Sequence, residues 1–334
     1  MSTKAFIIGS GSHLPEDVVT NEDLAEKLRL NAERIFRSSG IRSRRWASKD
    51  TATSSLAVIA LEKALENAAI RVSEVDYLFC GTMTPDRFIP GSAAAIQKEA
   101  GLGEIPCLDI RAACCNALYA MQLASALVLS GVARNVAICL AEIQSRYLDL
   151  TPEAATTSML FGDGAAALVV SANAQPGALE LLDVFLETDG SYLDDLGIRC
   201  PGTALSATQS QDMLENRSDY FPRMNGQSVI LQASRRMVGA GRTVLERNQL
   251  AATSIRWLVP HQANANLLAQ VARGLGVTNA ETISVLEEFG NTSSASMGIA
   301  LDTLRRSQRI GKGDYLLLPA FAAGFTWGAA LCRA

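Results

Sequence analysis

Two adjacent cysteines, Cys114 and Cys115, lie where a strand-like run meets a helix-like run. PCLDI at 106–110 reads as a strand, and ALYAMQLASALVL at 117–129 reads as a helix with an apolar face. A cysteine at a helix N-terminus meets unpaired N–H groups and the helix dipole, which favour the thiolate and lower the pKa of the thiol. The same N–H groups can stabilise the oxyanion that forms when a thiolate attacks a carbonyl. Buried cysteines are also common as inert packing residues, so this segment alone leaves both interpretations open.

Two further side chains could assist a cysteine nucleophile. His261 follows a strand-like run and Pro260 in VPHQANANLL, at the end of a strand where α/β folds place groups that contact ligands. Asn291 lies in FGNTSSASMG, a turn that opens a helix. Taken singly, the histidine could be a packing residue and the asparagine a plain helix cap. Together with a cysteine, however, these residue types form a known way to activate or exploit a thiolate.

The two halves of the 334-residue chain carry the same sequence signals in the same order. The matched segments are 61–70 with 241–250, 75–79 with 255–259, 93–102 with 265–275, 111–124 with 289–301, 135–142 with 315–324, and 161–170 with 325–333. Strands that alternate with helices predict parallel-rich sheets covered by helices. We therefore predict a duplicated α/β layered sandwich, with an N-terminal half at 1–172 and a C-terminal half at 173–334, stacked across a pseudo-twofold axis.

This repeat predicts where the candidate residues meet. In the matched segments Asn291 occupies the position that Cys114 occupies in the first half. The pseudo-twofold axis would bring those two helix N-termini together, with the His261 loop beside them. The polar segment Glu187–Gly226 has no counterpart in the first half. It is either an insertion that covers a substrate or an ordinary surface excursion, and the sequence favours neither.

Composition excludes several classes of protein. With 48% hydrophobic and 19% charged residues the chain is a packed globular protein, and its net charge of −4 gives no reason to expect nucleic acid or a membrane as partner. The N-terminal apolar run is too short for a signal peptide, and the apolar run at 117–133 is interrupted by polar residues, so we expect a core helix and a cytoplasmic protein. Seven cysteines without CxxC spacing and two histidines predict free thiols and no metal site.

Three other motifs receive plain interpretations. GSGS at 9–12 lacks the third glycine of a dinucleotide-binding loop, so we expect a turn. FGDGAAALVV at 161–170 is expected to be a turn that feeds a strand, because no Gly-Lys-Ser/Thr follows. SRRWA at 43–47 and Arg235–Arg236 are either local basic patches for an acidic partner or, more simply, solvated surface charge.

These motifs together resemble the β-ketoacyl-[acyl-carrier-protein] synthase III family of the thiolase-like superfamily. The segments that carry the resemblance are GSHLPEDVVTNEDLA, SSGIRSRR, DIRAACCNALYA, FGDGAAA, VPHQAN, GNTSSAS and AGFTWGAAL. They span nearly the whole chain in the family's order. The resemblance implies a five-layered αβαβα sandwich, a homodimer, and thioesters of coenzyme A or of an acyl carrier protein as substrates, with no cofactor.

The resemblance also implies a role for each candidate residue. Cys114 would accept an acyl group from a thioester, and His261 and Asn291 would assist the decarboxylation of a malonyl thioester whose carbanion attacks the acyl-cysteine. The backbone N–H groups of Cys114 and Ala323 would form the oxyanion hole. Ala323 stands where the family usually has glycine, which a backbone donor tolerates if the local dihedral angles suit alanine. Cys115 is then a packing residue.

Several positions implied in substrate binding depart from the family's common pattern. Arg34 stands where many members have a tryptophan and Ala155 where they have an arginine, a pair that clamps the adenine of coenzyme A. Ile89 replaces the aromatic residue that the partner subunit often sends into the acyl pocket, and Asn116 replaces a glycine. The other residues expected in substrate binding are Asn225, Gly226, Asn264 and Phe325.

The sequence thus predicts a condensing enzyme that makes a 3-oxoacyl thioester in fatty-acid or secondary-metabolite synthesis. One alternative is an acyltransferase that moves the acyl group from Cys114 to a hydroxyl or amine without decarboxylation. A further alternative is a catalytically silent subunit that supports an active paralogue.

Overall fold

The computed structural model describes residues 4–203 and 217–334 of the chain. Ten of its strands form one mixed sheet. The strand order is β12-β11-β13-β14-β8-β1-β7-β6-β4-β5. The strands are β1 Phe6–His13, β4 Tyr77–Gly81, β5 Cys107–Ile110, β6 Asn135–Glu142, β7 Gly164–Ser171, β8 Leu179–Thr188, β11 Ile255–Leu258, β12 Glu281–Thr282, β13 Tyr315–Ala322 and β14 Thr326–Arg333. At the centre β1 pairs with β8 over a short antiparallel stretch.

The strand order is symmetric about the β1–β8 pair. In the first half β7 pairs antiparallel with β1 and β6, whereas β4 pairs parallel with β6 and β5. In the second half β14 pairs antiparallel with β8 and β13, whereas β11 pairs parallel with β13 and β12. The predicted duplicated α/β sandwich is therefore confirmed, while the boundary between residues 172 and 173 stays a prediction.

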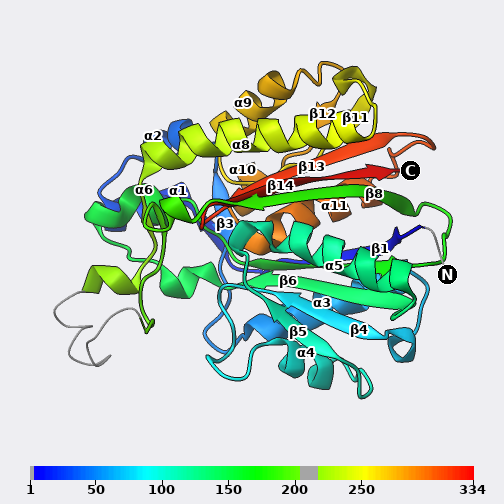
Figure 1. Ribbon diagram of the computed structural model, residues 1–334. Helices are drawn as coiled ribbons and strands as arrows, with labels where there is room; N and C mark the ends of the chain where they lie inside the picture. The colour runs from blue at the N-terminus through cyan, green and yellow to red at the C-terminus, as the bar shows by residue number, and fades with distance from the viewer. Residues whose placement is uncertain (1–3, 204–216) are drawn as a thin grey trace.

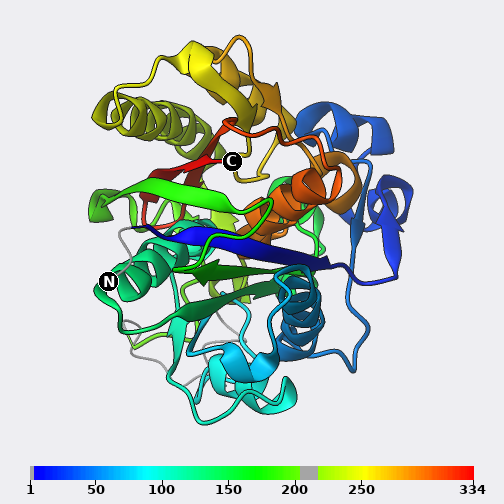
Figure 2. The same ribbon diagram turned by 90° about the vertical axis from the view of Figure 1, so that its right-hand side faces the viewer.

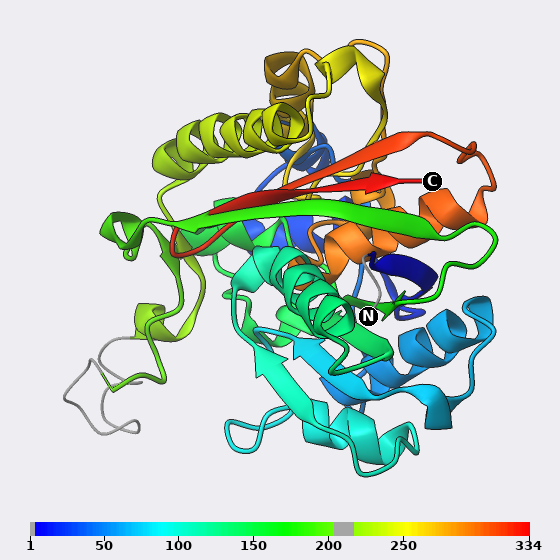
Figure 3. The same cartoon turned by 45° about the vertical axis from the view of Figure 1, so that its right-hand side comes forward.

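Helices cover both halves of the sheet and fill the space between them. α3 and α4 pack outside the first-half strands, α8 and α9 outside the second-half strands, and α5 and α11 lie between the two (Figure 1). Figures 2 and 3 show the same order of layers from the side. The helices are α3 Thr53–Asn67, α4 Ala93–Glu99, α5 Asn116–Ser130, α8 Gly226–Arg247, α9 Ala265–Leu275 and α11 Ser296–Arg306. This gives five layers in the order αβαβα.

The central layers explain the most apolar parts of the sequence. α5 contacts β6, β7 and β8, so apolar residues occur around much of its circumference. Residues 113–130 are the one segment, among those the structure describes, that is long and apolar enough to span a membrane. Its position between the two halves of the sheet identifies it as the predicted core helix. β6 and β7 are buried at every position because helices cover both of their faces.

Residues 9–12 are part of β1, so the predicted turn is wrong. A Cβ atom at Gly9 would collide with the carbonyl oxygen of Ala64, and one at Gly11 with that of Ala60, both in α3. The glycines therefore serve the close approach of α3 to β1, which is the usual reason for glycine inside a strand.

The N-terminal helices enclose a buried arginine. The elements that surround it come from the N-terminal segment and from two later helices. They are β2 Val18–Thr20, α1 Asn21–Leu28, α2 Ala32–Ser39, β3 Ser43–Arg45, α6 Ala155–Ser158 and α10 Leu286–Phe289. Arg44 is fully buried and donates to the carbonyl of Met159 at 2.8 Å and to Oδ1 of Asn21 at 2.9 Å. Burial lowers its pKa to about 10. Arg44 therefore belongs to the core, and both interpretations of SRRWA as surface charge are wrong for this residue.

Candidate active site

The turn that carries Cys114 faces a matching turn from the second half. One 3-10 turn, Ala113–Cys115, leads into α5, and the other, Ser293–Ala295, leads into α11; the two turns pack against each other. Ala113 and Ser293 both have positive φ, 49° and 47°. The counterpart of Cys114 is therefore Ser294. The prediction that Asn291 is the counterpart is wrong by three residues, because the repeated signals leave the register inside the turn undetermined.

One short segment, residues 291–296, contains one of the three candidate catalytic side chains and contacts the other two. The hydroxyl of Ser293 lies 3.6 Å from Sγ of Cys114. The side chain of Asn291 belongs to the same segment, and its Oδ1 accepts a hydrogen bond of 2.9 Å from the backbone N–H of Ser293. Oγ of Ser296 lies 2.7 Å from Nδ1 of His261. The fold thus brings Cys114, His261 and Asn291 together from distant parts of the sequence.

His261 is held as a neutral imidazole. It is 3% exposed, and burial lowers its pKa to about 4. Oγ of Ser296 also accepts a hydrogen bond of 3.2 Å from the backbone N–H of Gln262, and a hydroxyl that accepts there can donate its own proton to Nδ1 of His261. A neutral imidazole that accepts at Nδ1 carries its proton at Nε2. In this tautomer His261 offers a hydrogen-bond donor on the side of the ring that faces away from Ser296.

The thiol of Cys114 has a raised pKa. Burial raises it to about 12, and the negative charge of Glu142 adds to this, whereas the hydrogen bond with Ser293 acts in the opposite direction. The expectation of a lowered pKa is wrong, because desolvation of the thiolate outweighs the helix N-terminus. The thiol is protonated in the resting protein, so it must lose its proton when it reacts.

Cys115 is a packing residue in this structure. It is fully buried, and its Sγ contacts the carbonyl oxygen of Thr326 at 3.5 Å. Asn116 is also buried, and its Oδ1 accepts a hydrogen bond of 2.6 Å from the backbone N–H of Ala112. This hydrogen bond stabilises the turn, and Asn116 is not one of the residues that line the pocket.

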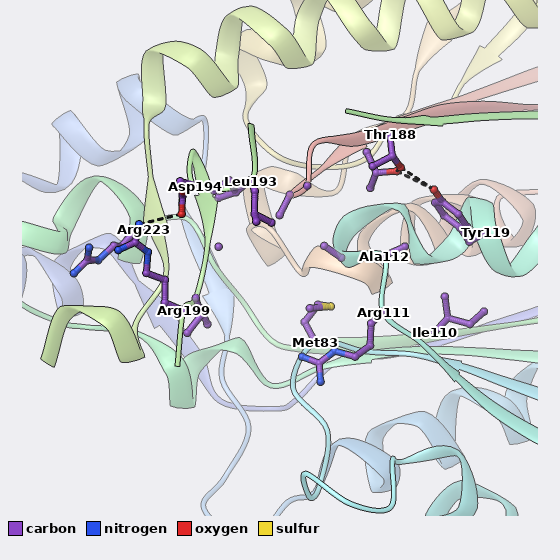
Figure 4. Close-up of a pocket in the computed structure, with 17 residues that line it drawn as sticks. Met83, Ile110, Arg111, Ala112, Tyr119, Thr188, Leu193, Asp194, Arg199 and Arg223 are labelled. Atoms are coloured by element: carbon purple, nitrogen blue, oxygen red, sulfur yellow. Dashed lines mark hydrogen bonds and ion pairs between the residues drawn. The ribbon is translucent and has the colours of Figure 1, made fainter. Parts of the chain in front are cut away.

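A pocket of about 890 Å³ opens beside the nucleophile turn (Figure 4). Ala112 and Ala113 of that turn line it, together with Ala323 and Gly324 after β13. Gly324 has φ of 136°, which favours glycine, but Ala323 has no positive φ. The backbone at 323 therefore tolerates the alanine that replaces the family's usual glycine.

The segment 187–226 forms one wall of this pocket. It contains the short strands β9, Leu196–Gly197, and β10, Arg223–Met224, which pair with each other. Its lining residues are Thr188, Leu193, Asp194, Leu196, Gly197, Ile198, Arg199 and Arg223. Of the two interpretations left open by the sequence, the structure favours the one in which this segment covers a substrate. Residues 204–216 of the segment lie outside the described residues.

Two residues predicted to bind substrate lie at a separate hollow. Arg34 lines a depression of about 620 Å³ on α2, which also includes Glu33, Arg37 and Ser38. Asn264 caps α9 and donates a hydrogen bond of 2.8 Å to the carbonyl of Ser38, so it lies beside the hollow. Neither residue lines the large pocket.

The other predicted binding residues have varied surroundings. Asn225 caps α8, which Gly226 begins. Phe325 is buried and stacks on Tyr192 with ring centroids 4.9 Å apart, so it packs inside the protein. Ile89 is 78% exposed on the loop before α4.

Several polar residues of the site have no pattern in the sequence that would single them out. Ser293 and Ser296 were part of a run interpreted only as helix-capping chemistry. Tyr119, Thr188 and Thr326 form a hydroxyl cluster on the pocket wall, with oxygen–oxygen distances of 2.9–3.2 Å. Their partners are 69 to 207 residues apart in the sequence, so spacing carries no signal of the cluster.

Comparison with known proteins assigns this architecture to a family. Models described as 3-oxoacyl-[acyl-carrier-protein] synthase III and as its C-terminal part match residues 108–190 and 245–334. The β-ketoacyl-[acyl-carrier-protein] synthase III of Chlamydia trachomatis serovar D is 38% identical over 330 residues, which cover 99% of each protein. The chain belongs to the 3-oxoacyl-[acyl-carrier-protein] synthase III family.

Solved structures of a synthase III and of a polyketide priming ketosynthase have the same fold. The 3-oxoacyl-[acyl-carrier-protein] synthase III from Aquifex aeolicus VF5 is 30% identical, with a TM-score of 0.88 over 99% of this chain and 100% of that one. The priming β-ketosynthase from the R1128 polyketide biosynthetic pathway is 31% identical, with a TM-score of 0.88 over 99% and 96%. The chain is therefore a thiolase-like condensing enzyme of the acyltransferase class, as its sequence predicted.

Proposed function

We propose that this synthase III uses Cys114, His261 and Asn291 to condense an acyl thioester with a malonyl thioester. The observation that carries the proposal is that one segment, residues 291–296, contains Asn291 and contacts the side chains of both Cys114 and His261. The acyl donor is a thioester of coenzyme A or of an acyl carrier protein. The product is a 3-oxoacyl thioester.

In the first step Cys114 takes the acyl group. Its sulfur attacks the thioester carbonyl, the carbon–sulfur bond of the donor breaks, and the donor leaves as a thiol that carries the proton lost by Cys114. The backbone N–H groups of Cys114 and Ala323 donate to the oxyanion of the tetrahedral intermediate. Support for this role comes from the pocket lining, which includes Ala323 and Ala113, the residue before Cys114, and from the ordinary backbone conformation of Ala323.

In the second step a malonyl thioester loses carbon dioxide. The bond between its carboxylate and its α-carbon breaks, and the electron pair moves to the thioester oxygen as an enolate. Nε2–H of His261 donates to that oxygen, as does the side-chain amide of Asn291. The hydrogen bond from Ser293 to Oδ1 of Asn291 supports this assignment, because it leaves the NH₂ group of the amide free to donate.

In the last step the α-carbon attacks the acyl carbonyl on Cys114. The new carbon–carbon bond forms, the carbon–sulfur bond to Cys114 breaks, and the thiolate released takes up a proton from water to restore the resting thiol. A neutral His261 suits this order of steps, because it stabilises the enolate through a hydrogen bond without protonating the carbanion.

We also propose that the protein is cytoplasmic and forms a homodimer. Each subunit would consist of an N-terminal half at 1–172 and a C-terminal half at 173–334. β5 is the last strand of the sheet, and its outer edge is unpaired among the described residues. Large apolar side chains are exposed near it, with Phe88 at 73%, Ile89 at 78% and Leu108 at 46%. An exposed strand edge with apolar neighbours favours pairing with a second copy. Sedimentation at micromolar concentration tests the dimer, and a monomeric mass would contradict it.

Intact-protein mass spectrometry tests the chemistry. We expect acyl-CoA or acyl carrier protein donors to add one acyl mass to the wild type and to Cys115→Ala, but not to Cys114→Ala. Malonyl carrier protein should then release carbon dioxide and discharge the acyl-enzyme. Discharge by a hydroxyl or amine acceptor without carbon dioxide would indicate plain acyl transfer. Decarboxylation that persists in both His261→Ala and Asn291→Ala would contradict their roles.

A further inference from the structure

Arg111 is the third residue before the proposed nucleophile, and its side chain lines the large pocket. Figure 4 shows it extending beside Met83, on the side of the pocket that faces Arg199. It directly precedes Ala112 and Ala113, which line the pocket as well. The guanidinium group is thus the charged side chain closest along the chain to the point where the acyl group is loaded.

Arg111 is exposed, and it forms neither an ion pair nor a side-chain hydrogen bond with the residues that the structure describes, although its charge acts on the carboxylate of Asp109 two residues away. The nearest carboxylate in sequence, Asp109, is engaged by the backbone N–H groups of Ser92 and Ala93 at 2.8–3.3 Å. The other two pocket arginines are already paired: Arg199 lies 3.0 Å from Asp194, and Arg223 lies 2.9 Å from Asp219.

The remaining pocket wall has little to offer a charged ligand. Its apolar part comes from Met83, Ile110, Leu193, Leu196 and Ile198. The hydroxyls of Tyr119, Thr188 and Thr326 are hydrogen-bonded to one another. An acyl chain that fills this pocket therefore meets apolar walls and one unpaired cation. Displacing water from an unpaired guanidinium is costly unless the ligand supplies an anion, and a carboxylate matches the planar donors of arginine in a bidentate pair.

We propose that Arg111 selects an acyl donor whose chain ends in a carboxylate, a class also called ω-carboxyacyl thioesters. The inference rests on the proposed function, because it concerns the acyl group that Cys114 receives. The acyl group is transferred to Cys114 by the same step as proposed above: the thioester carbon–sulfur bond of the donor breaks and the donor leaves as a thiol. The terminal carboxylate takes no part in this step and stays ionised beside Arg111. Residues three apart have Cα atoms within about 10 Å, so chains of roughly four to six carbons suit the site.

The test compares two donors of equal length that differ in one charge. Glutaryl-CoA and its monomethyl ester are each incubated with the enzyme, and the rate of mass gain on Cys114 is measured for both. We expect the wild type to prefer glutaryl-CoA by about 10-fold or more, the range of one charge-assisted hydrogen-bonded pair. In Arg111→Met the ratio should fall to about one, and Arg111→Lys should keep part of the preference. Because the ratio uses two donors on one preparation, partial unfolding of a variant cancels.

Arg134→Met is the matched control. Arg134 is exposed just before β6, away from the end of that strand that carries Glu142, and should keep the wild-type ratio. A wild-type ratio of one or below, or a ratio unchanged in Arg111→Met, would overturn the inference while the proposed function stands. If no acyl donor adds mass to Cys114, the proposed function falls and the inference with it.

Discussion

Oγ of Ser296 lies 2.7 Å from Nδ1 of His261, and the backbone N–H of Gln262 donates to the same oxygen at 3.2 Å. One hydroxyl thus fixes the orientation of the imidazole, and where it donates to Nδ1 it also keeps the ring proton at Nε2. Without it, the neutral ring is free to carry the proton at Nδ1 and to present an acceptor to the enolate.

Ser296→Ala should therefore slow the decarboxylation of malonyl carrier protein by about 10-fold or more, the loss expected when one oriented donor is removed. Loading of Cys114 should change far less. Carbon dioxide release and mass gain measure the two steps separately. Ser296→Thr keeps the hydroxyl and should retain most of the decarboxylation rate. Equal losses in both steps would instead indicate that Ser296 acts only through stability.

Burial of His261 predicts how stability depends on pH. Its pKa is about 4 in the folded protein and about 6.5 when unfolded, so below pH 6.5 the unfolded chain binds a proton that the folded one does not. Its contribution is complete above pH 6.5 and is lost as the pH falls toward 4, by about 1.4 kcal/mol per unit and about 3 kcal/mol in total. Urea unfolding of wild type and His261→Gln between pH 4.5 and 7.5 measures this. Parallel curves would contradict it, because the carboxylates titrate equally in both proteins.

The raised pKa of Cys114 predicts its reactivity. With a pKa of about 12, the thiolate fraction rises steadily with pH and reaches no plateau below pH 10. We expect the rate of iodoacetamide modification at Cys114, followed by peptide mass, to rise over this whole range in the free enzyme. The partly exposed Cys107 serves as an internal reference. A plateau near pH 7 would mean that the resting enzyme stabilises the thiolate.

The backbone conformation of the loop after β13 predicts that substitution at Gly324 destabilises the protein more than substitution at Ala323. Gly324 has φ of 136°, a conformation that is strained for any residue with a Cβ atom, so Gly324→Ala should lower the free energy of unfolding by about 1–3 kcal/mol. Ala323 has no such conformation, and Ala323→Gly should cost less than 1 kcal/mol through chain entropy. Urea unfolding of both variants gives the comparison. A larger loss at Ala323 would show that its methyl group packs against something essential.

The sequence predicted the architecture well, because repeated apolar runs fix which strands and helices correspond. β6 and β7 are recognisable from uninterrupted apolar runs, and α5 from an apolar helix with a few polar interruptions. The repeat could not set the register of Asn291 against Cys114, since the match tolerates loops of different length. The position of Cys114 at a helix start was visible, whereas its desolvation depends on residues from both halves. Arg44 shows the same limit, because its buried partners lie 23 and 115 residues away.

The two facing turns, each with a left-handed residue at Ala113 or Ser293, have an evolutionary consequence. We infer that the chain descends from a symmetric pair of identical units, in which both turns had equal standing. In the present chain the turn Ala113–Cys115 carries the thiol proposed as nucleophile. The turn Ser293–Ala295 carries hydroxyl side chains instead. Neither half holds the complete proposed site, because Cys114 comes from the first half and His261 and Asn291 come from the second, so neither half alone could carry out the proposed reaction.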